Sequence, residues 1–157
     1  MNQSKILRSF VFVLFLVTAV TLCCYAAQSP QRPGYVYVLS NVGSFGEGVY
    51  KIGMTEREKP ELRVRELGDA SVPFPFDIHV MIATDHPKEL ERKVHEELND
   101  YRINKFNLKK EFFRTDLDTI VSSIKKHHDK PIEVTREPRG WEYRQSVGNV
   151  KIGQTVN

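Results

Sequence analysis

The sequence predicts an α+β domain in which helices flank a small antiparallel sheet of three strands, with a hydrophobic segment ahead of the domain. Three features of the chain predict this fold. Two short runs of aromatic and β-branched residues are separated by a glycine-rich stretch, amphipathic runs of helical period follow them, and one run near the N-terminus carries no charge. The elements alternate in the order ββαβα(β)α, which is typical of an α+β domain.

The N-terminal segment, residues 1–27, has the composition of an export signal or a membrane anchor. Its only charges are Lys5 and Arg8, and no charged residue occurs from Phe10 to Ala27. The uninterrupted apolar run is about 15 residues long, which is short for a bilayer that needs roughly 20, so a cleaved signal is favoured over an anchor. With either interpretation the rest of the chain is exported, as a secreted or periplasmic domain or as one tethered to a membrane through residues 9–27.

Changes in composition predict the boundaries of the domain. Residues 28–33 contain two prolines and no aliphatic or aromatic side chain, which predicts a linker. Residues 34–128 hold the predicted strands and helices, and residues 129–157 form a polar C-terminal extension interrupted by proline, which we expect to be loose or docked. Of the 23 Lys and Arg residues, two lie in the N-terminal segment, so the remainder nearly balances the 20 Asp and Glu residues. Nucleic-acid binding must therefore rest on local clusters of charge.

The predicted strands are short and rich in β-formers. Residues Tyr35–Ser40 and Val49–Met54 flank a glycine-rich stretch of eight residues and are expected to pair as a hairpin. A third strand is predicted over Phe76–Ala83, in which alternate positions are aliphatic. Such alternation places one face of the strand against a core.

The predicted helices show an apolar period of three to four residues. A short helix begins at Pro60 and ends near Leu67, before a glycine. A longer helix follows from about residue 85 to residue 101. The last one is expected to start with a variant capping box formed by Thr115 and Asp118, and to run to His128.

The first predicted hairpin carries side chains suited to phosphate chemistry. It places Tyr37 and Tyr50 on neighbouring strands, and the helix that follows carries Arg63 and Arg65. Phenols beside guanidinium groups suit a phosphate, because arginine is a permanently charged planar fork for phosphate oxygens. A phenol with its ordinary pKa near 10 needs a cation to hold the phenolate, and Lys51 could supply it. Taken singly, each residue is better explained as a core aromatic or a solvated surface charge.

A second cluster of candidates lies later in the chain. Glu111 is the one acidic residue in a basic stretch, and His95 lies on the long helix beside apolar neighbours. A carboxylate in such surroundings either forms an ion pair or holds a hard cation such as Mg²⁺, while His95 alone is compatible with a packed helix histidine. The basic residues of the stretch are Arg102, Lys105, Lys109, Lys110 and Arg114.

The order of five motifs resembles the GIY-YIG nuclease superfamily. It is most similar to the compact branch found in phage and bacterial proteins, whose second signature reads Lys-Ile-Gly-x-Thr and is matched here with Gly53 and Thr55 as its glycine and threonine. The likeness covers about Gly34 to Lys126. The motifs are Gly34–Asn41, Val49–Thr55, Arg63–Leu67, Glu91–His95 and Lys110–Arg114.

The resemblance implies a three-stranded sheet and a phosphodiesterase site with one metal ion, Mg²⁺ or Mn²⁺. By matching positions, Tyr37 helps to activate the attacking water and Gly53 permits close approach of the backbone. Arg63 stabilises the pentacovalent phosphate and Glu111 binds the metal ion. His95 matches a histidine of the compact branch. The predicted catalytic set is therefore Tyr37, Tyr50, Lys51, Arg63, His95 and Glu111, and the predicted nucleic-acid contacts are Arg65, Lys105, Lys109, Lys110 and Arg114.

Two departures from the superfamily pattern matter. Lys51 replaces the second catalytic tyrosine, and Tyr50, one residue earlier, is expected on the opposite face of its strand. Leu67 occupies a position where several active nucleases carry histidine. A Mg²⁺-dependent endonuclease acting on nucleic acid, with DNA favoured, is therefore the leading hypothesis. A catalytically inactive binding module and an exported interaction protein without a nucleic-acid role stay open as alternatives.

Overall fold

The computed structural model describes residues 32–69, 71–137 and 140–152. The predicted export or anchor segment, residues 1–27, lies outside the described residues, as do residues 153–157. Of the helices in the described part of the chain, none has the length and apolar run that a bilayer crossing requires.

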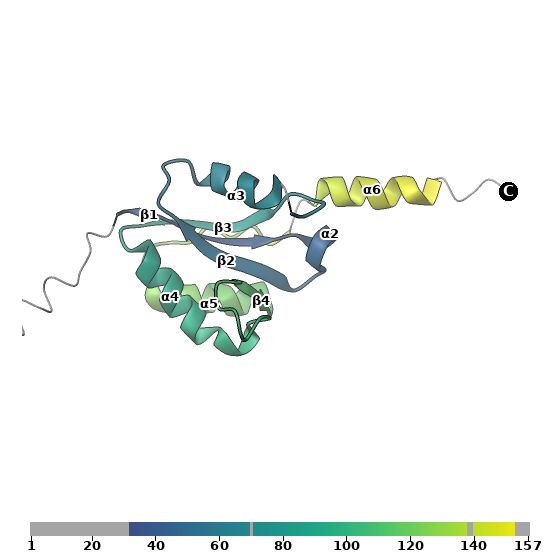
Figure 1. Ribbon diagram of the computed structural model, residues 1–157. Helices are drawn as coiled ribbons and strands as arrows, with labels where there is room; N and C mark the ends of the chain where they lie inside the picture. The colour runs from purple at the N-terminus through teal and green to yellow at the C-terminus, as the bar shows by residue number, and fades with distance from the viewer. Residues whose placement is uncertain (1–31, 70, 138–139, 153–157) are drawn as a thin grey trace, which may run out of the picture. The chain divides into compact units, whose positions relative to one another are not determined.

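Four antiparallel strands form the sheet, in the order β3-β1-β2-β4 (Figure 1). The α+β class and the antiparallel sheet are thus confirmed, whereas the prediction of three strands is wrong. The additional strand pairs with β2 and spans three residues, too few for an alternating pattern to be read from the sequence. The strands are β1 (Gly34–Ser40), β2 (Val49–Thr55), β3 (Asp77–Thr84) and β4 (Phe112–Arg114).

The predicted hairpin is formed by β1 and β2. Its register places Tyr37 opposite Gly53 and Leu39 opposite Lys51. The glycine-rich connection contains a single helical turn, α2 (Val42–Phe45), and then Gly48 with a φ of 70°, a value that favours glycine.

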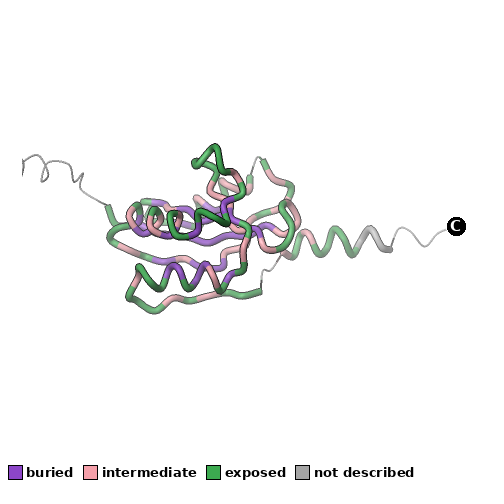
Figure 2. The backbone as a smooth tube through the Cα atoms, turned by 90° about the horizontal axis from the view of Figure 1, so that it is seen from below, coloured by how far each residue is buried: buried purple, intermediate pink, exposed green. Residues whose placement is uncertain are grey.

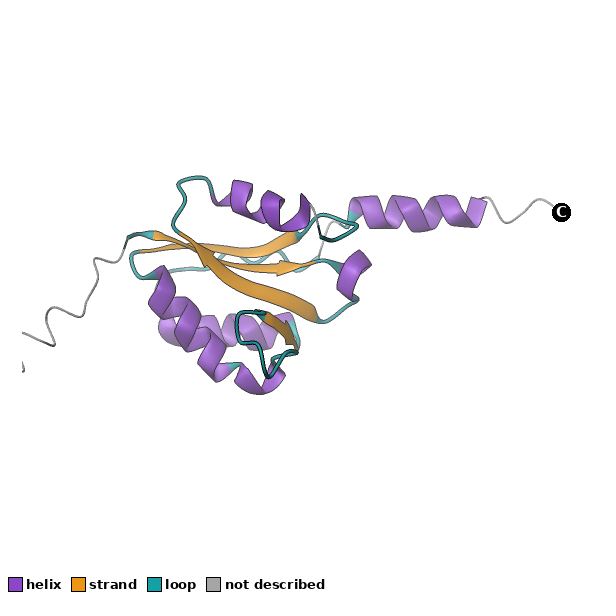
Figure 3. Cartoon of the chain, in the orientation of Figure 1, coloured by secondary structure: helices purple, strands orange, loops and turns teal. Residues whose placement is uncertain are grey.

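Helices cover both faces of the sheet. In Figures 1 and 3, α3 lies on one face, and α4 and α5 lie on the other. The predicted helix to residue 101 ends earlier, because the chain tightens into a 3₁₀ turn after α4. Helix α5 is capped by Asp116, which accepts a hydrogen bond from the Thr119 N–H (2.7 Å), and not by the expected pair Thr115 and Asp118. The helices are α3 (Pro60–Asp69), α4 (Pro87–Glu97), the 3₁₀ turn η1 (Asn99–Tyr101), α5 (Leu117–His127) and α6 (Trp141–Ile152).

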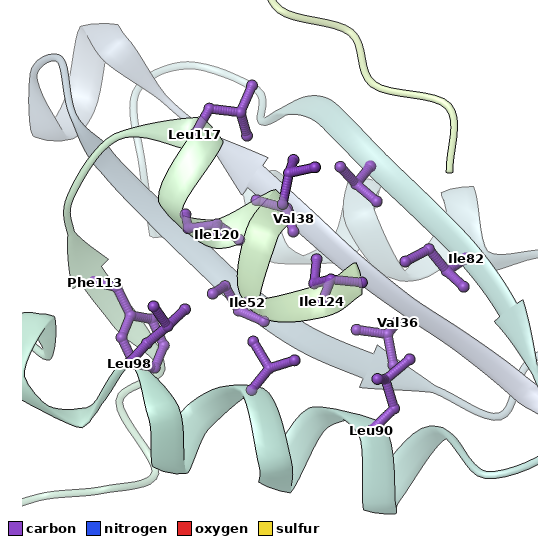
Figure 4. Close-up of a cluster of buried hydrophobic side chains, with 13 residues drawn as sticks. Val36, Val38, Ile52, Ile82, Leu90, Leu98, Phe113, Leu117, Ile120 and Ile124 are labelled. Carbon is purple, nitrogen blue, oxygen red and sulfur yellow. The ribbon is translucent and has the colours of Figure 1, made fainter. Parts of the chain in front are cut away.

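The main hydrophobic core fills the space between the sheet and the helices α4 and α5 (Figure 4). It unites alternate residues of the strands with one stripe of each helix, as amphipathic patterning predicts. A smaller cluster under α3 consists of Tyr37, Leu39 and Val64. Figure 2 shows the buried backbone concentrated in these layers.

The segment after α5 lies against β3 and is not loose over its first residues. The Thr135 N–H donates to the carbonyl of His79 (2.8 Å), and His79 Nδ1 lies 2.6 Å from the carbonyl oxygen of Thr135. Because that oxygen only accepts, Nδ1 carries the proton, and Nε2 accepts from the hydroxyl of Ser40 (2.8 Å). Ile132 and Val134 pack against the main core.

We predict that Ile120→Ala lowers the free energy of unfolding by about 2–5 kcal/mol, because the side chain is fully buried in the main core and its removal leaves a cavity. Urea denaturation measures the change. Leu62→Ala, at a side chain that is 45% exposed, serves as the control and should change stability by less than about 0.5 kcal/mol. Equal losses in both variants would contradict the assignment of the core.

We predict that His79 makes the stability of the fold depend on pH. Burial lowers the pKa of His79 below its ordinary value near 6.5, so the folded state favours the neutral ring. The neutral His79 ring makes its full contribution to the free energy of unfolding above pH 6.5. This contribution is lost as the pH falls from 6.5 toward the lower pKa of the folded state. The difference in unfolding free energy between wild type and His79→Asn should therefore shrink over this range. A difference that is constant with pH would contradict the assignment.

Candidate active site at the outer edge of β2

The outer edge of β2 is completed by side chains of α4. Strand β4 pairs with β2 as far as Lys51, and the Ile52 N–H donates to the backbone carbonyl of Glu111 (3.1 Å). Beyond this point, His95 Nε2 donates to the carbonyl of Ile52 (3.0 Å), and the carboxylate of Glu91 accepts from the backbone N–H of Met54. Unpaired backbone groups at a buried edge are costly, so these bonds fix both side chains in place.

Gly53 shapes the position of Tyr37 on the neighbouring strand. The phenol ring lies over Gly53, and a Cβ added there would come within 2.7–2.9 Å of the Tyr37 ring and hydroxyl. Real side chains do not approach so closely, hence only glycine allows this arrangement. The close approach expected at Gly53 is therefore made by the Tyr37 side chain of the same domain.

Arg63 supplies the cation next to the Tyr37 phenol. Tyr37 is almost fully buried, and burial raises the pKa of its phenol above the ordinary value of 10.0. The charge of Arg63 and a hydrogen bond with it lower the pKa of Tyr37, but by less than burial raises it. The Arg63 side chain is 41% exposed, and its guanidinium forms an ion pair with Glu66 (3.5 Å). Arg63 is therefore accessible to solvent next to a buried phenol.

Lys51 pairs with Glu111 and not with a tyrosine. Its ammonium lies 2.8 Å from the Glu111 carboxylate and 5.2 Å from the centre of the Phe112 ring. The expectation that Lys51 would stabilise a phenolate is thus not met, since Arg63 takes that place. The structure does bring Lys51 and Glu111 to the same face of the sheet as Tyr37.

Glu91 belongs to this cluster and was missed as a site residue in the sequence. Its pKa is raised to about 7, mainly by burial and then by the charge of Glu111, while Lys51 and the bond from Met54 oppose the rise. Its position one helical turn before His95 was the available signal, because residues four apart share one face of a helix. A cation placed between the two carboxylates would be stabilised by both, because the charge of Glu111 already acts on Glu91.

His95 acts as a positioning group in this arrangement. Its Nε2 proton is used by the carbonyl of Ile52, and its ring lies 5.0 Å from the ring of Phe113. Burial lowers the pKa of His95, so the neutral ring is favoured. It ties α4, and with it Glu91, to the edge of β2.

Some predicted residues are not brought to the cluster. Tyr50 lies on the opposite face of β2, where its ring contacts His79 edge-on at 5.3 Å, because side chains alternate along a strand. The catalytic assignment of Tyr50 is therefore not supported by its place. Arg65 lies on α3 at an exposed position beside Gly68 and Phe76. Thr55 is buried and accepts a hydrogen bond from the Arg57 N–H (3.3 Å).

The basic stretch between η1 and the end of β4 holds some cations that are bonded within the fold and others that are exposed. Lys105 donates to the carbonyls of Asn99 (3.0 Å) and Asp100 (2.7 Å) and so caps the 3₁₀ turn. Its predicted role in binding nucleic acid is weakened, because its donors are used within the fold. Exposed positions are held by Lys109, Lys110 and Arg114, whose side chains form no ion pair in the described part of the chain.

The donor set at this edge fits a magnesium ion. Within residues 32–137, apart from residue 70, and residues 140–152, no group of three or more His, Cys, Asp or Glu side chains is arranged to hold a metal. Mg²⁺, however, is commonly held by one or two carboxylates, with waters and substrate phosphates completing its shell. Glu91 and Glu111 provide such a pair, and burial together with the nearby charge of Glu111 raises the pKa of Glu91 to about 7.

A comparison with known protein families matches residues 34–128 to the T5orf172 domain. The match covers every element from β1 to α5 and all the side chains of the cluster. Searches of curated proteins and of solved structures each found no match.

We predict that Gly53→Ala destabilises the fold through Tyr37, by about 1–3 kcal/mol, since the added methyl group overlaps the phenol ring. The test is a double-mutant cycle in urea denaturation. In a Tyr37→Ala background, where the ring is absent, Gly53→Ala should cost much less. An equal cost in both backgrounds would show that the strain lies elsewhere.

Proposed function

The chain belongs to the T5orf172 domain family, a phage-associated domain related to nuclease-type domains, and from that premise we propose that it is a metal-dependent endonuclease of the GIY-YIG type that hydrolyses phosphodiester bonds. The observation that carries the proposal is the meeting of four different groups at one edge of β2. A guanidinium next to a phenol lies beside two carboxylates, one of which has its pKa raised to about 7. Together these groups can hold a phosphate, orient a water and bind a divalent cation.

The reaction is a single displacement at phosphorus, in which a water oxygen forms a bond and one ester oxygen leaves. Arg63 is exposed enough to contact a phosphate and holds the non-bridging oxygens, whose charge increases in the transition state. Tyr37, kept neutral by burial, orients the attacking water through its hydroxyl group. Mg²⁺ or Mn²⁺, when bound, neutralises phosphate charge and lowers the pKa of a bound water.

Glu91 is proposed as the principal metal ligand, with Glu111 as the second carboxylate. The Glu111 side chain already has Lys51 as a counter-ion at 2.8 Å, whereas Glu91 is held by one backbone N–H and has no cation of its own in the described residues. His95 and the bond from Met54 fix Glu91 to the sheet edge without occupying all of its acceptor sites. Lys51, which replaces the second tyrosine, is the counter-ion of Glu111.

A catalytically inactive nucleic-acid-binding module is the second candidate. The ion pair between Lys51 and Glu111 favours it, because it neutralises a carboxylate that the nuclease assignment gives to the metal. In that case the exposed Lys109, Lys110 and Arg114 bind phosphates and no bond is cut.

We predict that Glu91→Gln lowers the rate of plasmid nicking in Mg²⁺ by at least about 100-fold, with the fold retained, because the variant preserves shape and removes the charge. Glu96→Gln is the matched control, since Glu96 lies on the same helix but is exposed and paired with Arg92. EDTA should abolish the wild-type activity. If wild-type protein binds DNA in a salt-dependent manner but never nicks it, the proposed endonuclease activity is refuted and the inactive binding module is favoured. Undiminished nicking by Glu91→Gln would refute the assignment of the metal ligand.

A further inference from the structure

The loop that joins η1 to β4, residues 102–111, stands out from the body of the domain (Figure 2). Its tip is Phe106, whose side chain is fully exposed at 101%. One exposed apolar side chain is ordinary, but several of them in one loop region mark an interaction surface. Its exposed apolar neighbours are Tyr101, Ile103 and Leu108.

The loop holds Phe106 outward through a set of local hydrogen bonds. Asn104 Oδ1 accepts from the N–H groups of Phe106 (3.1 Å) and Asn107 (2.8 Å). At the base of the loop, Arg102 donates to the carbonyl of Leu108 (3.0 Å), and its guanidinium lies 4.7 Å from the centre of the Phe113 ring. With its base anchored in this way, the backbone of the loop is held in place at Phe106, which reduces the entropy lost on binding.

The charge around Phe106 selects the partner. Lys109, Lys110 and Arg114 lie between the tip and β4 or at its end, and their side chains form no ion pair among the described residues. The nearest acid in sequence toward β4, Glu111, is paired with Lys51. An aromatic side chain flanked by unpaired cations fits a nucleic acid, whose bases stack on the ring while its phosphates meet the cations.

We propose that Phe106 is an aromatic wedge that stacks on, or inserts between, the bases of the nucleic acid cut at the edge of β2. This inference rests on the proposed function and adds a preference for substrate. Inserting a side chain into intact duplex costs several kcal/mol of stacking, but much less where a base is already unpaired. The preferred substrate is therefore a nucleic acid with a bulge, mismatch or single-stranded gap.

The chain also limits the distance between the wedge and the site of cleavage. Glu111 follows Phe106 by five positions, and a chain advances at most about 3.6 Å per residue, so the two Cα atoms lie within roughly 18 Å of each other. Because B-DNA rises 3.4 Å per base pair, the limit is about five base pairs plus the reach of the two side chains. Cleavage is expected within that distance of the unpaired base.

The experiment compares two fluorescent duplexes, one fully paired and one with a single unpaired 2-aminopurine, bound to the full chain in EDTA. Wild-type protein should bind the bulged duplex more tightly and change the 2-aminopurine fluorescence. Phe106→Ala should lose roughly tenfold in affinity for the bulged duplex and lose the fluorescence change. Its folding should be unaffected, because the side chain contacts solvent alone. Trp141→Ala, at an aromatic side chain of α6 that is 64% exposed, is the matched control and should bind as wild type does.

Equal binding of both duplexes by wild type and Phe106→Ala would overturn the wedge. It would also be overturned if Phe106→Ala lost binding to anionic lipid vesicles while keeping its affinity for the bulged duplex, since the loop would then be a membrane contact. Because binding is measured in EDTA, the result does not depend on catalysis. A wild-type protein that shows the Phe106-dependent preference but does not nick plasmid in Mg²⁺ would sustain the wedge and overturn the proposed nuclease.

Discussion

The outer edge of β2 is the constraint on which the site depends. Strand β4 is three residues long and covers only the first half of this edge, so the second half must find hydrogen-bond partners elsewhere. Helix α4 supplies them through His95 and Glu91. A requirement of the backbone thus places a partly buried carboxylate beside Glu111, and the same bonds that complete the sheet orient the group proposed to bind a metal ion.

The face of the sheet that α3 covers adds the groups suited to a phosphate. Gly53 leaves room for the Tyr37 ring, and α3 brings Arg63 next to the phenol. Neither feature depends on a long-range ion pair, since the hairpin register and the following helix determine both. Lys51 connects the two halves of the site, because it lies on the face of Tyr37 and pairs with Glu111.

Much of this arrangement could be predicted from the sequence, and the failures have physical causes. The hairpin, the third strand and the long helix were predictable from periodicity, whereas β4 was too short to show any. Tyr37, Lys51, Arg63 and Glu111 do come together. Glu91 was overlooked because its role comes from a contact with the edge of a strand far away in sequence, and no local pattern reports such a contact. The loss of Tyr50 from the site follows from the alternation of side chains along β2.

Binding of Mn²⁺, followed by electron paramagnetic resonance in the absence of nucleic acid, tests the central claim most directly. Wild-type protein should bind the ion, Glu91→Gln should lose binding, and Glu111→Gln should weaken it. Glu89→Gln, at an exposed carboxylate of the same helix that is paired with Lys93, should bind as wild type does. Unchanged binding by Glu91→Gln would contradict the account, because the edge of β2 would then not be the place where the metal ion is held.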